Sequence, residues 1–405
     1  MVTDDKVGQL ELLMGNHAVV RGAIEAGVNV AATYPGTPAS EIGDLFAEIS
    51  KNAGIYFEYS TNEKLAYETA LAASWINLRS IVSMKHVGMN VIADALLSST
   101  YGGTEGGLVI VVGDDPSCYS SQNEQDSRYY AKFASIPCFE PANPEEIKNM
   151  VKSAFEISEK FKLPVLIRET TRTAHCSGNV EFGEITKHNI EPSFTKNLLR
   201  RAVLPTHAYQ LHPDLLKRFN DLSNELENSK WNELEIKGNL GVIACGITIN
   251  YVKETLNYEN INDLSLLKIG ITHPLPKKLI ENIIMHCDKV LIIEELEPLT
   301  ESYVKEIAYN LGKNVEIHGK DILPRTYEFN TSIVHDSIMK FINIQPKENF
   351  KGIEVPKEII PPRYPVLCPG CPHRATFFEI KKAFPKGIFP SDIGCYTLGI
   401  QPQQV

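Results

Sequence analysis

The chain has 405 residues, of which 43% are hydrophobic and 22% are charged, a composition typical of a globular protein with two or three domains. The formal net charge of −10 argues against a general nucleic-acid-binding protein, and no apolar run reaches the roughly 20 residues that cross a bilayer. The N-terminus lacks the basic region of an export signal, and the eight cysteines do not form a disulfide framework, so we expect a cytoplasmic protein with no membrane or nucleic-acid partner.

Helix and strand patterns alternate along the first 190 residues. Residues 15–26 have apolar side chains at helical spacing, with Gly27 as a C-terminal cap. Residues 28–33 predict a buried strand, which is followed by a Pro/Gly turn and a helix. Thr37 is expected to be the N-cap of this helix and Pro38 its first residue. The alternation continues with strands at 55–60, 80–86, 107–116 and 163–171 and helices at 62–78, 90–102 and 144–162. Apolar strands that alternate with helices predict a parallel sheet covered on both faces.

The rest of the chain predicts further units. The polar segment 191–236 is expected to be a connection that contains a helix. Residues 237–345 hold strand candidates at 240–246, 265–272, 289–297 and 314–319 with helices between them, which predict a smaller doubly wound domain. Residues 346–363 form a proline-punctuated linker, and residues 364–405 hold a CxxC motif and one helix, too little to close a core. We therefore predict an α/β protein with a first domain at 1–190, a second at 237–345 and the start of a third at 364–405.

Several polar segments follow predicted strands, where α/β proteins bind ligands. The turn at 34–38 precedes a helix N-terminus, which attracts anions, although a plain strand-to-helix turn is the better interpretation on local evidence. Glu63 begins a helix directly after a strand, and an exposed first-turn glutamate is again the simpler interpretation. Loops at 83–90 and 113–137 and an acidic cluster at 292–301 complete the set, and ordinary surface segments would also explain these. Taken singly, none is specific.

Together and in this order, the segments resemble a known family. The runs TYPGTPASEI, YSTNEKLAYETALAASW, MKHVGMN and SSQNEQDSRYYA, and the pairing of CPGCPHR with DIGCYTLG, resemble the α subunits of indolepyruvate:ferredoxin oxidoreductases. These are thiamine-diphosphate-dependent 2-oxoacid:ferredoxin oxidoreductases. The resemblance implies a pyrimidine-binding domain at 1–190, a transketolase-C-terminal-like domain at 237–345 and the opening of a diphosphate-binding domain at 364–405. Thiamine diphosphate would sit between the first and the third.

The resemblance also implies roles for single residues. Glu63 matches the glutamate that hydrogen-bonds the aminopyrimidine ring of the cofactor. Thr37 matches the threonine of a YPxTP turn that faces the substrate and the cofactor, so both residues are expected to be catalytic. The residues expected to bind the cofactor are Tyr34, Pro35, Gly36, Thr37, Glu63, Gly88 and Asn90.

The implied reaction is the oxidative decarboxylation of an aryl 2-oxoacid. Coenzyme A takes the acyl group, a [4Fe–4S] cluster takes the electrons, and ferredoxin and a smaller β subunit are the implied partners in a hetero-oligomer. The family's GDG…N motif for Mg²⁺ and diphosphate does not occur in this sequence, so we expect it in a missing C-terminal part or a partner chain, and the chain alone to be inactive. The alternatives are a different 2-oxoacid as substrate, or a non-catalytic subunit that supplies only the pyrimidine half-site.

Cys368 and Cys371 admit three interpretations. A structural zinc site needs four ligands, and only His373 and Cys395 lie nearby in the sequence. A thioredoxin-like pair should follow a strand, whereas this pair follows a proline-rich linker. A cluster site needs four thiolates, and the resemblance implies that Cys368, Cys371 and Cys395 bind a [4Fe–4S] cluster whose fourth ligand lies outside this sequence. The other cysteines are expected to be buried or incidental thiols: Cys118, Cys138, Cys176, Cys245 and Cys287.

Overall fold

Seven strands form the first sheet of the computed structural model, which describes residues 2–187, 190–345, 347, 356, 359, 365–391 and 394–400. Their order across the sheet is β12-β6-β7-β5-β4-β2-β3, and neighbours pair in parallel except β12 with β6. Their bounds are β2 (Val30–Thr33), β3 (Tyr56–Tyr59), β4 (Ser80–Lys85), β5 (Leu108–Asp114), β6 (Cys138–Phe139), β7 (Val165–Thr170) and β12 (Ile271–His273). The central strands β4, β5 and β7 are buried along their whole length, which explains their apolar runs.

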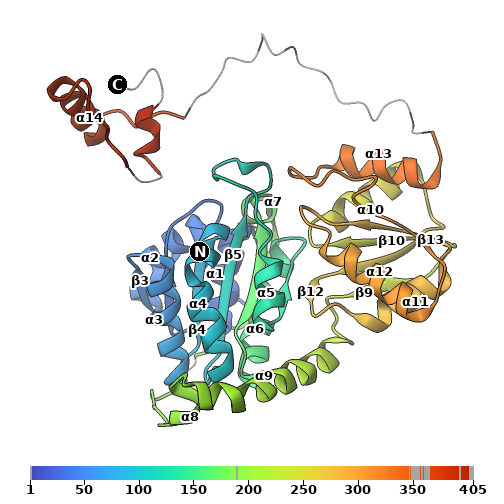
Figure 1. Ribbon diagram of the computed structural model, residues 1–405, viewed down its shortest axis with the longest axis horizontal. Helices are drawn as coiled ribbons and strands as arrows, with labels where there is room; N and C mark the ends of the chain where they lie inside the picture. The colour runs from blue at the N-terminus through green and yellow to red at the C-terminus, as the bar shows by residue number, and fades with distance from the viewer. Residues whose placement is uncertain are drawn as a thin grey trace. The chain divides into compact units, whose positions relative to one another are not determined.

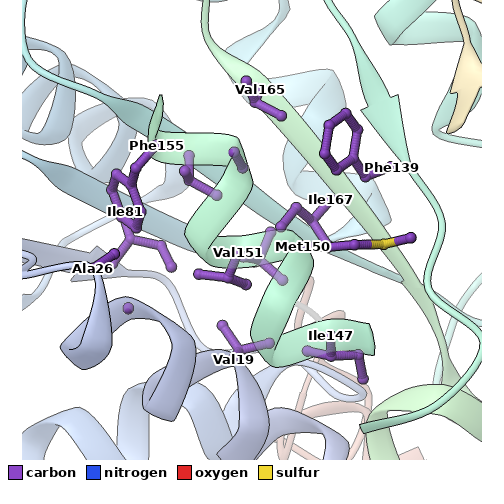
Figure 2. Close-up of a cluster of buried hydrophobic side chains, with 14 of the residues drawn as sticks. Val19, Ala26, Ile81, Phe139, Ile147, Met150, Val151, Phe155, Val165 and Ile167 are labelled. Carbon is purple, nitrogen blue, oxygen red and sulfur yellow. The ribbon is translucent and has the colours of Figure 1, made fainter. Parts of the chain in front are cut away.

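Helices cover both faces of this sheet (Figure 1). The helices α1 (Gly15–Glu25), α2 (Ser40–Ala53) and α6 (Pro144–Phe161) pack in one apolar core, and α3 (Glu63–Trp75), α4 (His86–Gly102) and α5 (Arg128–Ala134) pack in another. Figure 2 shows Val151 and Phe155 of α6 among Val19 of α1 and Ile81 of β4. The chain changes face between α2 and α3, so the sheet is doubly wound, and the predicted fold class is confirmed.

Smaller elements complete the segment before the second sheet. The strands β1 (Leu10–Met14) and β8 (Ser177–Glu181) pair antiparallel, and the short helix α7 (Thr171–His175) lies between β7 and β8. The predicted connection holds α8 (Leu198–Arg201) and α9 (Pro205–Leu226). In Figure 1, α9 runs from the first sheet toward the second.

The second sheet has five strands in the order β14-β13-β10-β11-β9, and only β9 is antiparallel to its neighbour. The strands are β9 (Glu233–Glu235), β10 (Leu240–Cys245), β11 (Ser265–Ile269), β13 (Lys289–Ile293) and β14 (Glu316–His318). The helices α10 (Thr248–Glu259) and α13 (Thr331–Ile342) share one core with it, and α11 (Lys277–His286) and α12 (Leu299–Leu311) share the other. This part is therefore the smaller doubly wound layer that the sequence predicts.

A cluster of buried ion pairs lies beside the first sheet, and one of its pairs reaches the second sheet. The Arg128 guanidinium at the start of α5 donates to Asp126 at 2.6 Å and to Glu294, which follows β13, at 2.6 Å. Arg168 of β7 donates to Asp114 at 2.6 Å. All five side chains are almost completely buried. Removing one member of the Arg128–Glu294 pair would leave a buried charge uncompensated, so this pair fixes the second sheet against the first.

The prediction that Thr37 caps α2 is wrong, and so is the prediction that Pro38 is the first residue of this helix. The helix begins at Ser40, with Ala39 at the N-cap position and no side-chain cap. The Pro38 carbonyl instead accepts a hydrogen bond from Asn16 Nδ2 at 2.7 Å, and the Ala39 N–H donates to the Gly36 carbonyl at 2.9 Å. These two bonds fix the turn in front of the helix, so its residues are not free to join the first helical turn.

The segments 83–90 and 113–137 are not loops throughout. The helix α4 begins at His86, directly after β4, so residues 86–90 are its first turns. The longer segment contains the 3₁₀ turn η1 (Pro116–Cys118) and α5, and its residues around Arg128 are buried because they contact the second sheet. Both segments look like loops in the sequence because polar residues interrupt their apolar pattern.

The predicted strand at 265–272 is two strands that belong to different sheets. β11 ends at Ile269, and β12 begins at Ile271 and pairs with β6 of the first sheet. Gly270 makes the change possible, because a Cβ atom there would lie 2.6 Å from the Trp231 carbonyl oxygen. The Asn232 side chain accepts hydrogen bonds from the backbone N–H groups of Gly270 and Ile271.

The last part of the chain is a separate unit. The chain divides into compact units at residues 1–348 and 349–405, and the finer predicted boundaries stay predictions. In the second unit, α14 (Pro372–Ala383) follows the CxxC motif and the 3₁₀ turn η4 (Thr397–Ile400) follows Cys395. The predicted linker at 346–363 lies outside the described residues except at 347, 356 and 359. No helix among the described residues is both long and apolar enough to cross a bilayer.

Candidate functional site

The candidate site lies where the connections of the first sheet diverge. After β2 the chain adds β3 on one side, and it then returns to add β4 on the other side of β2. The carboxyl ends of β2, β3 and β4 lie at the same edge because the three strands are parallel. Such a switch point is where doubly wound sheets bind ligands. The predicted site residues follow these three strands.

Glu63 is the first residue of α3 and is largely buried, with 8% of its surface exposed. Asn62 caps the helix by accepting the Leu65 N–H at 2.9 Å, which holds Glu63 at the helix entrance. Burial raises the pKa of the Glu63 carboxyl above its usual value, and a hydrogen bond from its own backbone N–H opposes the shift. Within the described residues, no other donor is hydrogen-bonded to this carboxylate. The simpler interpretation of an exposed first-turn glutamate is therefore wrong.

Gly88 gives Glu63 the space that its side chain occupies. A Cβ atom on Gly88 would lie 2.6 Å from Glu63 Cγ, 3.1 Å from Glu63 Oε1 and 3.0 Å from Met84 Cβ. Real Cβ atoms do not approach other carbon atoms so closely. Glu63 of α3 therefore packs directly against Gly88 of α4, and the structure brings these two predicted residues together. We call this pair the Glu63–Gly88 cradle.

The turn after β2 packs against the end of β4. A Cβ atom on Gly36 would lie 2.9 Å from Cβ of Lys85, the last residue of that strand. The Lys85 ammonium donates to the Ser120 carbonyl at 2.6 Å, and the Ser120 hydroxyl donates to the Thr37 carbonyl at 3.2 Å. Burial lowers the pKa of Lys85, which the nearby Asp115 carboxylate opposes. Sequence reasoning missed Lys85, Ser120 and Asp115, because only the fold brings residues 36, 85 and 120 together.

The other predicted residues lie on the surface of the same edge. Tyr34, Pro35 and Thr37 are exposed at the turn. Asn90 is exposed on α4, and its side-chain oxygen accepts a hydrogen bond from the Tyr130 hydroxyl at 2.5 Å. The described contacts do not join Asn90 to Glu63 or to the turn, so its place in a site stays a prediction.

The cradle fits the aminopyrimidine ring of thiamine diphosphate. That ring needs a carboxylate partner at a ring nitrogen, and Glu63 is a buried carboxylate that has no other side-chain partner in the described chain. Gly88 lets the Glu63 side chain pack directly against the backbone of α4, which holds the carboxylate at this edge. The described residues show no arrangement for the diphosphate or for Mg²⁺.

The cysteines of the second unit do not form a metal centre in this structure. Cys368 and Cys395 are exposed, and Cys371 is half-buried. Among the described residues, no group of three His, Cys, Asp or Glu side chains could hold a metal ion. The assignment of Cys368, Cys371 and Cys395 to a cluster stays a prediction. The remaining five cysteines are free thiols that are buried or half-buried, as predicted.

The chain is similar to known proteins over most of its length. Residues 21–214 match the family model for the thiamine-diphosphate-binding domain of pyruvate flavodoxin/ferredoxin oxidoreductases. The chain is 50% identical to the indolepyruvate oxidoreductase subunit IorA of Thermococcus kodakarensis, over 98% of this chain and 63% of that protein. It is 42% identical to the IorA subunit of Methanothermobacter marburgensis, over 99% of this chain and 66% of that protein. The chain thus spans a little under two thirds of the length of these relatives.

Two solved structures share the fold. The 2-oxoglutarate:ferredoxin oxidoreductase of Magnetococcus marinus, solved with 2-oxoglutarate, coenzyme A and succinyl-CoA, superposes with a TM-score of 0.66 at 15% identity, over 82% of this chain and 65% of that one. A split-gene transketolase, solved as an inactive tetramer, superposes with a TM-score of 0.52 at 12% identity, over 82% of this chain and 99% of that one. At these identities the likeness establishes the architecture of both sheets and no more.

Proposed function

We propose, from the premise that this chain belongs to the same family as the IorA subunits of indolepyruvate oxidoreductases, that it supplies the pyrimidine half-site of a thiamine-diphosphate-dependent 2-oxoacid oxidoreductase. The observation that carries this proposal is the Glu63–Gly88 cradle at the switch point. Glu63 is buried and has no partner among the described side chains. Burying such a carboxylate costs folding free energy unless a ligand binds to it.

Glu63 accepts a hydrogen bond from the aminopyrimidine ring in the proposed site. Its raised pKa follows from burial, and a carboxyl whose pKa lies nearer neutral pH exchanges a proton more readily during turnover. Thr37 and the rest of the turn form the wall that faces the 2-oxoacid. Bound thiamine diphosphate supplies a carbon nucleophile and an electron sink for the decarboxylation.

We extend the proposal to the finer assignments. The substrate class is an aryl 2-oxoacid of the indolepyruvate type, because the relatives with the highest identities quoted above are indolepyruvate oxidoreductase subunits. Coenzyme A is the acyl acceptor, ferredoxin the electron acceptor, and a smaller β subunit completes a hetero-oligomer. Mg²⁺ binds together with the diphosphate of the cofactor. A [4Fe–4S] cluster takes Cys368, Cys371 and Cys395 as three of its ligands. The free state of all eight cysteines favours a cytoplasmic location.

Glu63→Gln in the assembled enzyme tests the half-site. Loss of a positioned acid–base group typically slows a reaction by about 10²–10⁴-fold, so we expect hydrogen–deuterium exchange at C2 of bound thiamine diphosphate to slow at least 100-fold. The variant should fold at least as well as the parent, because a buried charge is removed. Glu68→Gln is the matched control, since Glu68 is an exposed glutamate of the same helix. Unchanged exchange in the Glu63 variant would refute the assignment.

A further inference from the structure

The loop at 115–124 is hydrogen-bonded both to elements of the first sheet and to the segment that follows the second sheet. On the side of the first sheet, Lys85 donates to the Ser120 carbonyl at 2.6 Å, and His86 Nε2 lies 3.2 Å from Asn123 Oδ1. Lys85 and His86 are the last residue of β4 and the first residue of α4. The loop is therefore attached to the strand whose carboxyl end forms the switch point.

The other attachments come from the segment after the second sheet. The Glu328 N–H donates to the Ser117 hydroxyl at 2.9 Å, and the Tyr327 N–H donates to Glu124 Oε1 at 2.9 Å. The Glu124 carboxylate also accepts the Ser117 N–H at 2.6 Å, which closes the loop on itself. The loop is thus ordered by backbone and side-chain bonds at both of its ends, although it carries few apolar residues.

Lys85 contacts both the loop and the predicted substrate-facing turn. Only 8% of its surface is exposed. Its alkyl chain runs beside Gly36, whose Cβ position would lie 2.9 Å from Lys85 Cβ and 3.5 Å from Lys85 Cδ. Its ammonium reaches Ser120, and the Ser120 hydroxyl in turn donates to the Thr37 carbonyl. The strand end, the turn and the loop are therefore joined in a closed ring of contacts through one side chain.

A charged residue at this position calls for an explanation. Packing against Gly36 needs only an alkyl chain, which a methionine would provide without removing an ammonium group from water. The ammonium is kept because it bonds to a loop carbonyl, and the Asp115 carboxylate, which accepts the Ser120 N–H at 2.9 Å, offsets part of the charge. The bond to the loop, rather than the packing, is what requires lysine.

We propose that Lys85 is a positioning residue of the half-site, which fixes the Tyr34–Thr37 turn and the 115–124 loop against each other as one wall. This inference rests on the proposed function, because the turn is the predicted substrate-facing element. Lys85 acts through Gly36 and Ser120 and need not touch the substrate.

Hydrogen–deuterium exchange on the full chain, without substrate or cofactor, tests the proposal. In Lys85→Met we expect exchange at least tenfold faster in peptides that contain the Ala39 and Ser120 amides, which are bonded to the turn and to Asp115 in the parent. Lys85→Arg keeps a donor for the Ser120 carbonyl and should restore slow exchange. Lys148→Met is the matched control, because Lys148 is a similarly buried lysine of α6, and it should leave both peptides unchanged.

Two results would overturn the proposal: unchanged exchange in both peptides of Lys85→Met, or exchange in Lys85→Arg as fast as in Lys85→Met. If Lys85→Met does not fold, Ser120→Ala replaces it, and faster exchange at Ala39 is expected because the hydroxyl bond to the Thr37 carbonyl is lost. No change there would count against the proposal in the same way.

Kinetics of the assembled enzyme separate this inference from the proposed function. Lys85→Met should raise the KM for the 2-oxoacid at least fivefold while kcat changes less, and Lys85→Arg should restore the KM. An assembled parent enzyme that oxidises no 2-oxoacid would refute the proposed function, but the exchange result would still decide whether Lys85 joins the turn and the loop.

Discussion

Arg128→Met should weaken the attachment between the two sheets of the first unit. The guanidinium of Arg128 bonds to Asp126 through Nε and Nη2 at 2.9 and 2.6 Å and to Glu294 at 2.6 Å. It also donates to the carbonyls of Glu295 and Glu297, both at 3.0 Å. Three of these four partners follow β13 of the second sheet, so the substitution removes a contact between the layers while keeping a similar side-chain volume.

The expected loss follows from the charges that remain. Removing one partner of a buried ion pair typically costs about 3–5 kcal/mol. Asp126 keeps Arg168 at 3.9 Å, and Glu294 keeps the amides of Thr300 and Glu301 at 3.0 and 2.9 Å, which reduce the penalty. We therefore expect a loss of about 3 kcal/mol in the free energy of unfolding.

Urea denaturation followed by circular dichroism measures this loss. The control is Lys160→Met, because the Lys160–Glu225 pair is exposed and should be worth about 0–1 kcal/mol. The loss of stability at acid pH gives a second measurement. The Arg128 and Arg168 guanidinium groups overcome the effect of burial and hold the pKa of Asp126 at about 2, so the stability from this group is complete above the unfolded value of 3.8 and is lost as the pH falls toward 2. A loss in Arg128→Met no larger than the control's would refute the reasoning.

Two further predictions concern buried carboxylates. Gly88→Ala places a methyl group 2.6 Å from Glu63 Cγ, so we expect the assembled enzyme to bind thiamine diphosphate at least tenfold more weakly by calorimetry. The control is Gly22→Ala, whose methyl group would meet the Lys148 carbonyl and should lower stability by about 1–3 kcal/mol while leaving cofactor binding intact. Equal binding by the parent and both variants would contradict the role of the Glu63–Gly88 cradle. Burial raises the pKa of Glu169 from 4.5 to about 8, so the folded state binds its proton more tightly and stability falls as the pH rises through this interval, by up to about 1.4 kcal/mol per pH unit. Glu169→Gln should remove that slope in urea titrations between about pH 5 and pH 8, and a slope that persists would show that another group causes it.

The regular part of the fold was accessible from the sequence because its signals are local. The run LVIVV of β5 is apolar at every position, since both of its faces are covered. The apolar spacing of α6 likewise matches the face that it buries (Figure 2). Position after a strand makes Glu63 and the turn at 34–37 candidates, because the ends of parallel strands meet at one edge, and only the resemblance to the family gives these residues roles.

The errors arise where contacts between distant segments decide the outcome. The start of α2 depends on Asn16, which binds the Pro38 carbonyl from another helix. The burial of Glu63 depends on Gly88, which lies 25 positions after it in the sequence. Arg128 lies in a polar run that predicts a loop, but its side chain is buried because it bonds to Glu294, which follows β13. Such pairings leave no trace in local periodicity.

The pairing of β12 with β6 limits how the part of the chain that holds the first sheet can be studied by itself. β6 has only two residues, and β12, which comes from beyond residue 270, is its outer neighbour. A fragment that ends after α9 would lose this cover and expose the unpaired side of β6, an edge to which a second molecule can add a strand. We expect such a fragment to aggregate. A fragment that continues through β12 keeps this neighbour of β6, but it cuts the second sheet between β10 and β13. The natural limit of this domain is therefore spatial, and no single cut in the sequence reproduces it.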